Sequence, residues 1–502
     1  MFLLSNYVVG DPAAEGVREL FNLDKLENLT YFAVVKIIEI HQKHLDECRK
    51  SLDKVTKAKL NSKYKGTKAH SYISKKLKGA AVAPMTYLKR IKNEGPGKGI
   101  GTFATSPSER DEILHQAWDP ITLGNHKNLT QDAKDFLDKY KDCIFEHAEY
   151  KIGELTVEEF KVSCQNNKKS AAGLDGWTSA DLALLSDDAY SIIVDWLNLI
   201  EKGTFEWPEY MREVRAVFLS KDPEDTANPL AYRPLKITSA IYRRWATARL
   251  KKLETWVDLW DLPALHVIGA KGAQCAWLKT AIHVEKYKQL QLDMAGGSID
   301  IFKCFDQVNR HVVYHLAQKA GMPVGVLRAY FAYIDNINVR FQVANTIGRI
   351  HHERCSIPQG CPFSMAVVAL ITRVWVIHVQ KHNVEPRCLA DDLLFTAEGS
   401  GHRARAVNAM KLSRQFFTDM GARVATTKCF MFATDSRVRD FLGRYEFDDE
   451  GLKIPVSNNF RDLGSHLNLT NSTNGSTLTK RMHAAIRMLK HLLWMPLTIS
   501  EK

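Results

Sequence analysis

The sequence contains no C-x-x-C pair, although nine cysteines are spread over its 502 residues. Cysteines at that spacing mark zinc modules and disulfide frameworks, so neither is indicated, and a reducing compartment is the simplest inference. No segment has the charge order of a signal peptide. The best apolar run, residues 366–379, is too short to cross a bilayer and contains Arg373 and His378. We therefore expect a soluble intracellular protein, nuclear or cytoplasmic, that is neither secreted nor bound to a membrane.

Acidic residues are too few to balance the basic ones, which leaves a formal net charge of +12 and a pI near 9.1. The excess lies mainly in residues 49–98, where fifteen lysines and arginines face two acids and alternate with Tyr64, Tyr72 and Tyr87. Lysines can neutralise phosphates while aromatic rings stack on bases, so this segment predicts binding to RNA or to a template. A solvated or disordered basic linker would have the same composition.

Three aspartates stand in apolar surroundings. Asp300 follows Ile299, and the pair Asp391 and Asp392 lies inside C-L-A-D-D-L-L-F-T, so each site reads as the end or turn of a buried strand. Buried carboxylates need positive compensation. Two Mg²⁺ ions about 3.5–4 Å apart, with Mn²⁺ as a possible substitute, would supply it and would stabilise an in-line phosphoryl displacement. A lone Asp-Asp pair would equally suit a polar turn.

The order of the motifs is more specific than any one of them. Between Asp300 and Asp391 lies S-I-P-Q-G-C-P-F-S-M, residues 356–365, a loop marked by proline and glycine that leads into the apolar run. A carboxylate, then a Pro-Gln-Gly loop with a helix, then paired carboxylates is an arrangement that favours a nucleic-acid polymerase.

Over roughly residues 168–467 the chain resembles reverse transcriptases, most closely those of non-LTR retrotransposons. The resemblance implies that Asp300, Ile301, Asp391 and Asp392 hold the metal ions. Its motifs are K-K-S-A-A-G-L-D-G-W-T-S-A-D-L, N-P-L-A-Y-R-P-L-K-I-T-S-A-I-Y-R, D-I-F-K-C-F-D-Q-V, S-I-P-Q-G-C-P-F-S-M, L-A-D-D, G-A-R-V-A-T-T-K-C-F-M and F-R-D-L-G-S-H-L.

The sequence also departs from the family pattern. Leu389 stands where the family usually has an aromatic residue, Ala425 stands where it often has asparagine, and F-R-D-L-G is a loose version of the primer-grip strand. None of these departures removes a metal ligand. They affect the expected catalytic activity more than the expected fold.

Phe305 lies five positions after Asp300, where a turn from strand to helix would point it toward the incoming sugar. An aromatic ring there would crowd a 2′-hydroxyl, whereas a ribonucleotide polymerase needs a small or hydrogen-bonding group. Phe305 therefore favours dNTPs. A core phenylalanine beneath the helix is the alternative.

The remaining nucleotide contacts are predicted from residue type and place. The resemblance assigns Lys221 and Arg233 to the triphosphate, which a mobile ammonium and a rigid guanidinium suit. Gly360 lets the backbone approach the nucleotide closely, and Gln359 can hydrogen-bond its base or sugar. Lys428 is the candidate to bind the leaving pyrophosphate or give it a proton. Weaker triphosphate candidates are Arg215 and Lys236, and Asp306 is expected to cap the following helix.

The expected fold is α+β, a right-hand polymerase with fingers, an antiparallel-sheet palm and a partial helical thumb, plus a basic, mainly helical N-terminal extension. We expect a helix over residues 132–140, a primer-grip hairpin over 446–454 and a helix over 480–493. The predicted parts are the extension (1–105, ending in a glycine-rich linker), a helical lead-in (106–150), the fingers (151–290), the palm (291–435) and the primer grip with partial thumb (436–502).

Together these features predict an RNA-directed DNA polymerase that extends the 3′-hydroxyl of a DNA or RNA primer along an RNA template with dNTPs. A viral-type RNA-dependent RNA polymerase would show G-D-D and a polar residue at the Phe305 position. A group II intron maturase would carry a further helical domain after the thumb. A catalytically silent nucleic-acid-binding remnant stays open, as do the oligomeric state and whether the chain is a fragment of a longer polyprotein.

Overall fold

The computed structural model describes residues 85–493 apart from residues 96, 126–127, 167–169, 222–224, 267–270, 345 and 471–475, together with Lys43 and Glu47. The chain forms two compact units, Met1–Ala81 with Ala485–Lys502 and Val82–Ala484. The features considered below lie in the second unit, apart from residues 485–493 at the end of the last helix. Most of the predicted basic extension lies outside the described residues. This includes residues 49–84 of the segment that is predicted to bind RNA.

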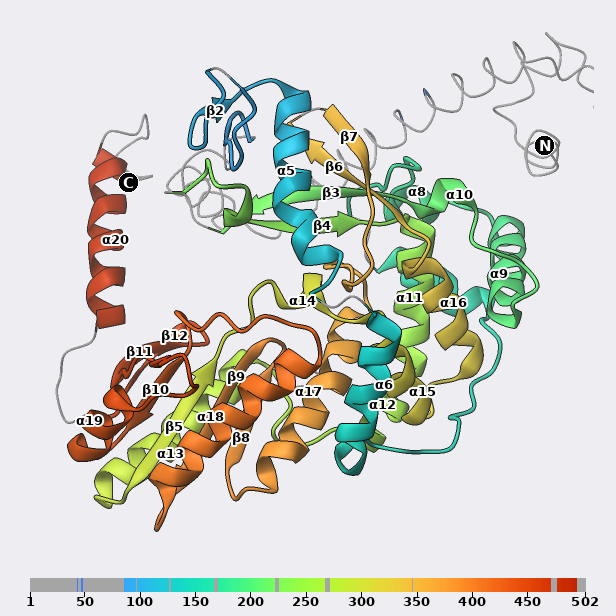
Figure 1. Ribbon diagram of the computed structural model, residues 1–502. Helices are drawn as coiled ribbons and strands as arrows, with labels where there is room; N and C mark the ends of the chain where they lie inside the picture. Colours follow the sequence, from blue (N-terminus) through green and yellow to red (C-terminus); the bar gives the residue numbers. More distant parts are fainter. Residues whose placement is uncertain are drawn as a thin grey trace, which may run out of the picture. The chain divides into compact units, whose positions relative to one another are not determined.

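Two four-stranded sheets and a set of helices make up the larger unit (Figure 1). The strands are β1 Leu88–Lys89, β2 Phe103–Ala104, β3 Glu213–Ser220, β4 Tyr232–Ile237, β5 Met294–Ile299, β6 Asn338–Val343, β7 Thr346–His351, β8 Glu385–Leu389, β9 Asp392–Glu398, β10 Phe430–Ala433, β11 Asn459–Asp462 and β12 Ser465–Asn468. The α-helices are α5 Pro107–Thr122, α6 Leu129–Lys139, α7 Val157–Gln165, α8 Ser179–Leu182, α9 Asp187–Lys202, α10 Glu209–Arg212, α11 Ala240–Lys252, α12 Glu254–Trp260, α13 Ala273–Gln289, α14 Cys304–Gln307, α15 Arg310–Lys319, α16 Val324–Ile334, α17 Ser364–Gln380, α18 His402–Asp419, α19 Ser436–Arg444 and α20 Ser476–Leu493.

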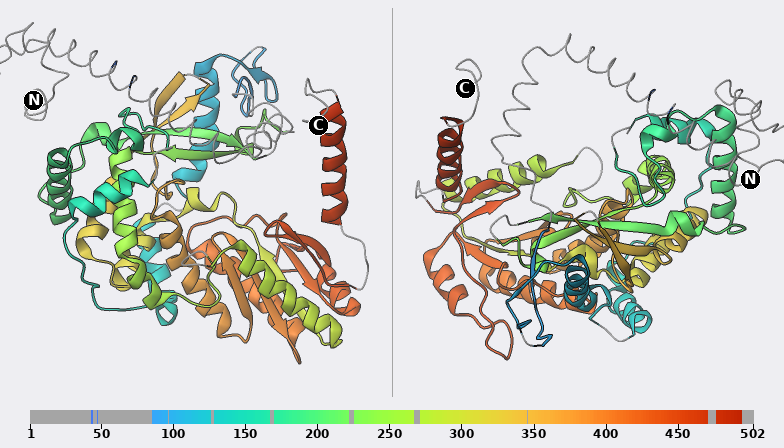
Figure 2. Two further views of the ribbon diagram at one scale, coloured as in Figure 1. Left: turned by 180° about the vertical axis from the view of Figure 1, so that it is seen from behind. Right: turned by 90° about the horizontal axis from the view of Figure 1, so that it is seen from above.

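The first sheet has the strand order β10-β5-β9-β8, and all of its neighbours are antiparallel. Side chains alternate between the two faces along each strand, and both faces of this sheet are buried. Leu393 and Phe395 of β9 join the core under α17 and α18, while Leu394 joins a smaller cluster with α13 and the β11–β12 hairpin. The views from opposite sides show α18 and α13 on opposite faces of this sheet (Figures 1 and 2).

The second sheet has the order β4-β3-β6-β7, in which β3 and β6 run parallel and the other pairs antiparallel. Helix α5 packs on it through Ile113, Leu114, Ala117, Trp118 and Ile121, residues spaced three or four apart on one helical face. Ser106 caps α5, and its side chain accepts a hydrogen bond from the Glu109 amide. The lead-in segment is thus anchored to a sheet that comes much later in the chain.

Two local expectations are confirmed. The helix expected over residues 132–140 forms within α6, which ends at Lys139, and the segment 480–493 is helical within α20. The antiparallel pair β3–β4 places Lys221 directly after β3. Among the described residues no helix has both the length and the apolar character that a membrane crossing requires.

Two local expectations are wrong. The glycine-rich run at residues 95–101 is no linker, since it closes the loop between β1 and β2, where Arg90 and Thr102 pair through their main chains. The hairpin expected at 446–454 is a turn in which the Phe447 amide donates to Leu452, without strands. The chain after that turn pairs with Met431 instead, and the hairpin lies further on, at β11–β12.

Candidate active site

The three carboxylates lie where two strands of the antiparallel sheet meet a turn. Strand β5 ends at Ile299, so Asp300 follows it directly, and Ala390 and Asp391 form the two-residue turn between β8 and β9. Ile299 pairs with Leu393, so continuing that register places Asp300 across from the start of β9. Ala390 has φ +54°, as tight two-residue hairpins require.

One cavity of about 870 Å³ gathers the predicted site. Nine of the ten predicted residues line it, and they come from five separate stretches of chain. They are Lys221, Arg233, Asp300, Ile301, Phe305, Gln359, Gly360, Asp391 and Lys428. Asp392 is the exception: it begins β9 beside the cavity and does not line it.

The pKa values of Asp300 and Asp392 are raised. Burial raises the pKa of Asp300, and the charge of Asp391 raises it further, although Lys428 and Lys221 act in the opposite direction. The surrounding protein and the neighbouring Asp391 raise the pKa of Asp392 to about 6. The protein supplies less positive charge here than the acids need, which is the electrostatic condition for binding a cation.

Basic side chains reach the same cavity from the other sheet and from the segment before β10. Lys221 continues β3, where its amide donates to Ala231, and Arg233 lies on β4. Burial lowers the pKa of Lys221, and the charges of Arg233 and Lys428 lower it further. Acidic and basic side chains therefore share one cavity, which can hold a cation and an anion together.

Lys303 also lines the cavity, although the sequence assigned it no role. Its Nζ donates to Leu230 O at 2.6 Å and to Tyr232 O, and it lies 4.6 Å from the centre of the Trp118 ring. Burial lowers its pKa to about 7. These contacts tie the turn after Asp300 to the start of β4, and the lysine in D-I-F-K was the available sequence signal.

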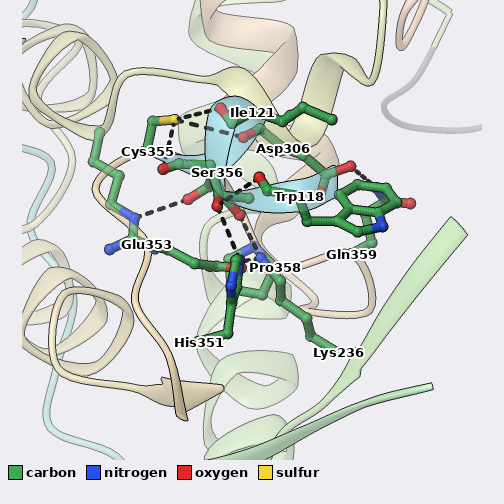
Figure 3. Close-up of polar contacts among 12 residues, drawn as sticks. Trp118, Ile121, Lys236, Asp306, His351, Glu353, Cys355, Ser356, Pro358 and Gln359 are labelled. Carbon is green, nitrogen blue, oxygen red and sulfur yellow. Dashed lines mark hydrogen bonds and ion pairs between the residues drawn. The ribbon is translucent and has the colours of Figure 1, made fainter. Parts of the chain in front are cut away.

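The Pro-Gln-Gly loop is held on two sides. The Lys236 amide of β4 donates to Gln359 O at 3.0 Å, and the Ile357 amide donates to Phe305 O at 2.8 Å. The Gln359 side-chain amide donates to Asp306 Oδ2 at 3.0 Å (Figure 3). The loop is thus fixed against β4 and against the short helix α14, which leaves Gly360 on the cavity wall.

Asp306 does not cap the following helix as expected. It lies inside α14, only 1% exposed, and Asn309 caps α15 by accepting from the His311 amide. Burial raises the pKa of Asp306 to about 6. Its observed role is to hold the Gln359 side chain.

The two weaker triphosphate candidates are turned away from the nucleotide. Lys236 is 2% exposed and its Nζ binds Glu353 at 2.7 Å, so the ammonium is already paired. Arg215 donates to Ala172 O and to the Gln342 side chain. Neither Lys236 nor Arg215 lines the cavity.

Replacing Gly360 by alanine should damage the loop. Its φ is +112°, and an added Cβ would lie 3.1 Å from Lys236 O and 3.3 Å from Leu235 Cδ1. We expect Gly360→Ala to lower the free energy of unfolding by roughly 1–3 kcal/mol and to raise the KM for nucleotide, as measured by urea unfolding and primer extension.

Gly399→Ala is the matched control. Gly399 has φ +67°, but an added Cβ would meet no atom within 4 Å, so it reproduces the backbone strain without the close approach. An unchanged KM in Gly360→Ala, or an equal rise in Gly399→Ala, would show that close approach at Gly360 does not shape the nucleotide site.

Carboxylates and basic side chains gathered in one cavity suit an enzyme that transfers phosphoryl groups. Residues 221–448 match the family model described as reverse transcriptase (RNA-dependent DNA polymerase). The chain therefore contains a reverse transcriptase domain and is an RNA-directed DNA polymerase, a nucleotidyltransferase. No protein in the curated set matches it. The family implies an RNA template, a primer, dNTPs and a divalent metal, without fixing which metal.

Proposed function

We propose that this chain is the polymerase of a non-LTR retroelement and extends a primer 3′-hydroxyl with dNTPs by two-metal phosphoryl transfer. The observation that carries the proposal is the shared cavity, which brings nine predicted residues together from five stretches of chain. In this reading the β10-β5-β9-β8 sheet is the palm, the β4-β3-β6-β7 sheet belongs to the fingers, and α20 begins the thumb.

The residues present suit divalent cations. Asp300 and Asp391 offer carboxylate oxygens and Ile301 its main-chain oxygen, which are the hard ligands that Mg²⁺ prefers and Mn²⁺ accepts. The charge of Asp391 raises the pKa of Asp300, and a bound cation would relieve that repulsion. When bound, the ions would neutralise the charge that develops on the attacking and leaving oxygens.

The chain's own groups then position the nucleotide. Lys221 and Arg233 can bind the triphosphate oxygens, since both reach the cavity and neither forms an ion pair with an acid among the described residues. Lys428 stands near Asp300 and Lys221, where an ammonium can bind the leaving pyrophosphate and give it a proton.

Phe305 is proposed to exclude the 2′-hydroxyl. The residue is half-buried on α14, packs against the main core and lines the cavity. This position suits a sugar-excluding role as well as a core role. We expect Phe305→Val to raise relative rNTP use by roughly 100-fold, because the pocket then accommodates the hydroxyl. Single-nucleotide incorporation with dGTP and GTP would measure the ratio.

Two further variants separate sugar exclusion from a general loosening of the site. Phe305→Tyr keeps the ring and should keep the selectivity, while Leu393→Val trims the nearby core without touching the cavity. An unchanged dNTP/rNTP ratio in Phe305→Val would leave Phe305 as a core residue only.

Primer extension on a primed poly-RNA template with Mg²⁺ tests the proposed function. Extension with dNTPs that is lost in Asp391→Ala/Asp392→Ala supports it, whereas preference for rNTPs would indicate an RNA polymerase. If the purified chain binds RNA in a salt-sensitive manner but extends no primer, the chain is a silent binder.

A further inference from the structure

Two histidines and an aspartate from distant parts of the chain meet away from the polymerase cavity. His115 and Asp119 lie one turn apart on α5, and His351 ends β7. The Nδ1 atoms of His115 and His351 are 3.4 Å apart. Asp119 Oδ1 lies 3.6 Å from His115 Nδ1 and 3.1 Å from His351 Nδ1. Three potential ligand atoms therefore form a nearly equilateral triangle.

That triangle has the size of one face of a zinc coordination tetrahedron. Zinc bonds to nitrogen and oxygen are about 2.0–2.1 Å long, which makes the edges of a regular tetrahedron about 3.3–3.4 Å. The observed edges of 3.1, 3.4 and 3.6 Å bracket this value. One ion can thus contact all three atoms with little movement of the side chains.

The outer nitrogen of His351 has a partner of the kind that orients metal-binding histidines, since His351 Nε2 lies 2.9 Å from Thr122 Oγ1. Such a contact fixes which ring nitrogen carries the proton and leaves Nδ1 free to ligate. His115 Nε2 forms no hydrogen bond within the described part of the chain and lies 3.8 Å from Asp111 Oδ2.

The site is closed on one side and open on the other. The side chains of His115 and His351 are 3% and 1% exposed, whereas that of Asp119 is 42% exposed. The open side gives an ion a path of entry and room for a water molecule as fourth ligand. Two imidazoles and one carboxylate favour a transition metal over Mg²⁺, which prefers oxygen ligands alone.

We propose that His115, Asp119 and His351 bind one zinc ion with a water molecule as fourth ligand. The ion pins α5 to the end of β7. Two residues after His351 stands Glu353, which pairs with Lys236 behind the Pro-Gln-Gly loop (Figure 3). The role is structural: the ion steadies the support of the nucleotide loop and takes no part in phosphoryl transfer. The proposal does not depend on the proposed polymerase function.

The chain offers a matched control in a second cluster of a histidine and acids, His283, Glu385 and Glu398. There Glu385 contacts Nδ1 of the ring at 3.4 Å while Glu398 contacts Nε2, so the two acids lie on opposite edges of one imidazole. Each ring nitrogen of His283 thus faces a carboxylate of its own, which makes His283 a matched histidine for comparison with His351.

Elemental analysis of the full chain, purified without chelators and dialysed against excess Mg²⁺, tests the proposal. We expect about one zinc per chain in the wild type and in His283→Gln, and at least a tenfold loss in His351→Gln and in Asp119→Asn. Zinc retained in both of those variants, or absent from the wild type after zinc is added back, would overturn the assignment.

Cobalt substitution gives a second readout that needs no variant. Adding Co²⁺ to the chelator-treated, refolded wild-type chain should produce the intense visible absorption of a four-coordinate site with nitrogen and oxygen ligands, and stoichiometric Zn²⁺ should remove it. Absorption of the weak six-coordinate kind only, or none, would mean that the two histidines are simply hydrogen-bonded to each other and to Asp119.

Discussion

Asp391→Asn should reduce dNTP incorporation by at least about 10³-fold, and Asp300→Asn should do the same, while Asp392→Asn should cost roughly 10-fold. Asp300 and Asp391 line the cavity and Asp392 does not. A metal ion that neutralises charge in the transition state would contribute several kcal/mol, and a variant that no longer holds the ion would lose that contribution. Each 1.36 kcal/mol corresponds to tenfold in rate. Single-turnover extension of a labelled primer with Mg²⁺ in excess would give the three rate constants.

Stability provides the control for these variants. Burial and the charge of Asp391 raise the pKa of Asp300, so removing the charge of Asp300 relieves repulsion. Asp300→Asn should therefore unfold at an equal or higher temperature than the wild type. A large loss of activity with unchanged stability places the effect in the chemistry. Equal losses in Asp391→Asn and Asp392→Asn would mean that both acids hold the ions and that the unequal placement does not matter.

The acidic part of the site was predictable because its signals are local. Apolar residues around Asp300 and Asp391 indicate strand ends, and the Pro-Gln-Gly loop carries its turn in its residue types. The antiparallel sheet then brings those strand ends together without further information. The resemblance supplied the partners from the other sheet, Lys221 and Arg233, whose own residue types fit a solvated surface as well as they fit a triphosphate site.

What the sequence failed to predict depends on contacts between distant segments. Asp306 was expected to cap a helix, but the residue that caps α15 is Asn309, three positions later. The Asp306 side chain instead accepts a hydrogen bond from Gln359. The 446–454 hairpin was inferred from a turn signal, yet a strand needs a partner, and the chain that follows finds its partner in Met431. Such outcomes are decided by tertiary pairing and not by local propensity.

The cluster of His115, Asp119 and His351 shows the same limit more sharply. The two histidines are 236 positions apart, so no spacing rule for metal ligands could connect them. The absence of C-x-x-C pairs argues against a cysteine zinc module, but it carries no information about a site made from a helix and a strand that meet only in the fold.

Burial reverses the interpretation of Lys236 as a phosphate contact. On a strand rich in basic residues it reads as a phosphate contact, but its side chain is 1% exposed and that of its partner Glu353 is 4% exposed. Arg310 also approaches Glu353, at 3.4 Å, and Ser356 contacts Lys236 Nζ. We expect Lys236→Met to lower the free energy of unfolding by about 3–5 kcal/mol, because Glu353 is left buried with less compensation. Urea unfolding would measure the loss.

The double variant decides whether the pair stabilises the protein or only becomes costly when broken. Replacing both members, as in Lys236→Met/Glu353→Leu, removes the buried charge altogether and should recover most of the lost stability. Lys319→Met, which breaks an exposed pair with Glu146, should cost less than about 1 kcal/mol. Because the Lys236 main chain holds Gln359, recovered stability with a raised nucleotide KM would show that the ion pair is kept for positioning the loop. A double variant as unstable as Lys236→Met would instead show that the charged pair itself is needed for the fold.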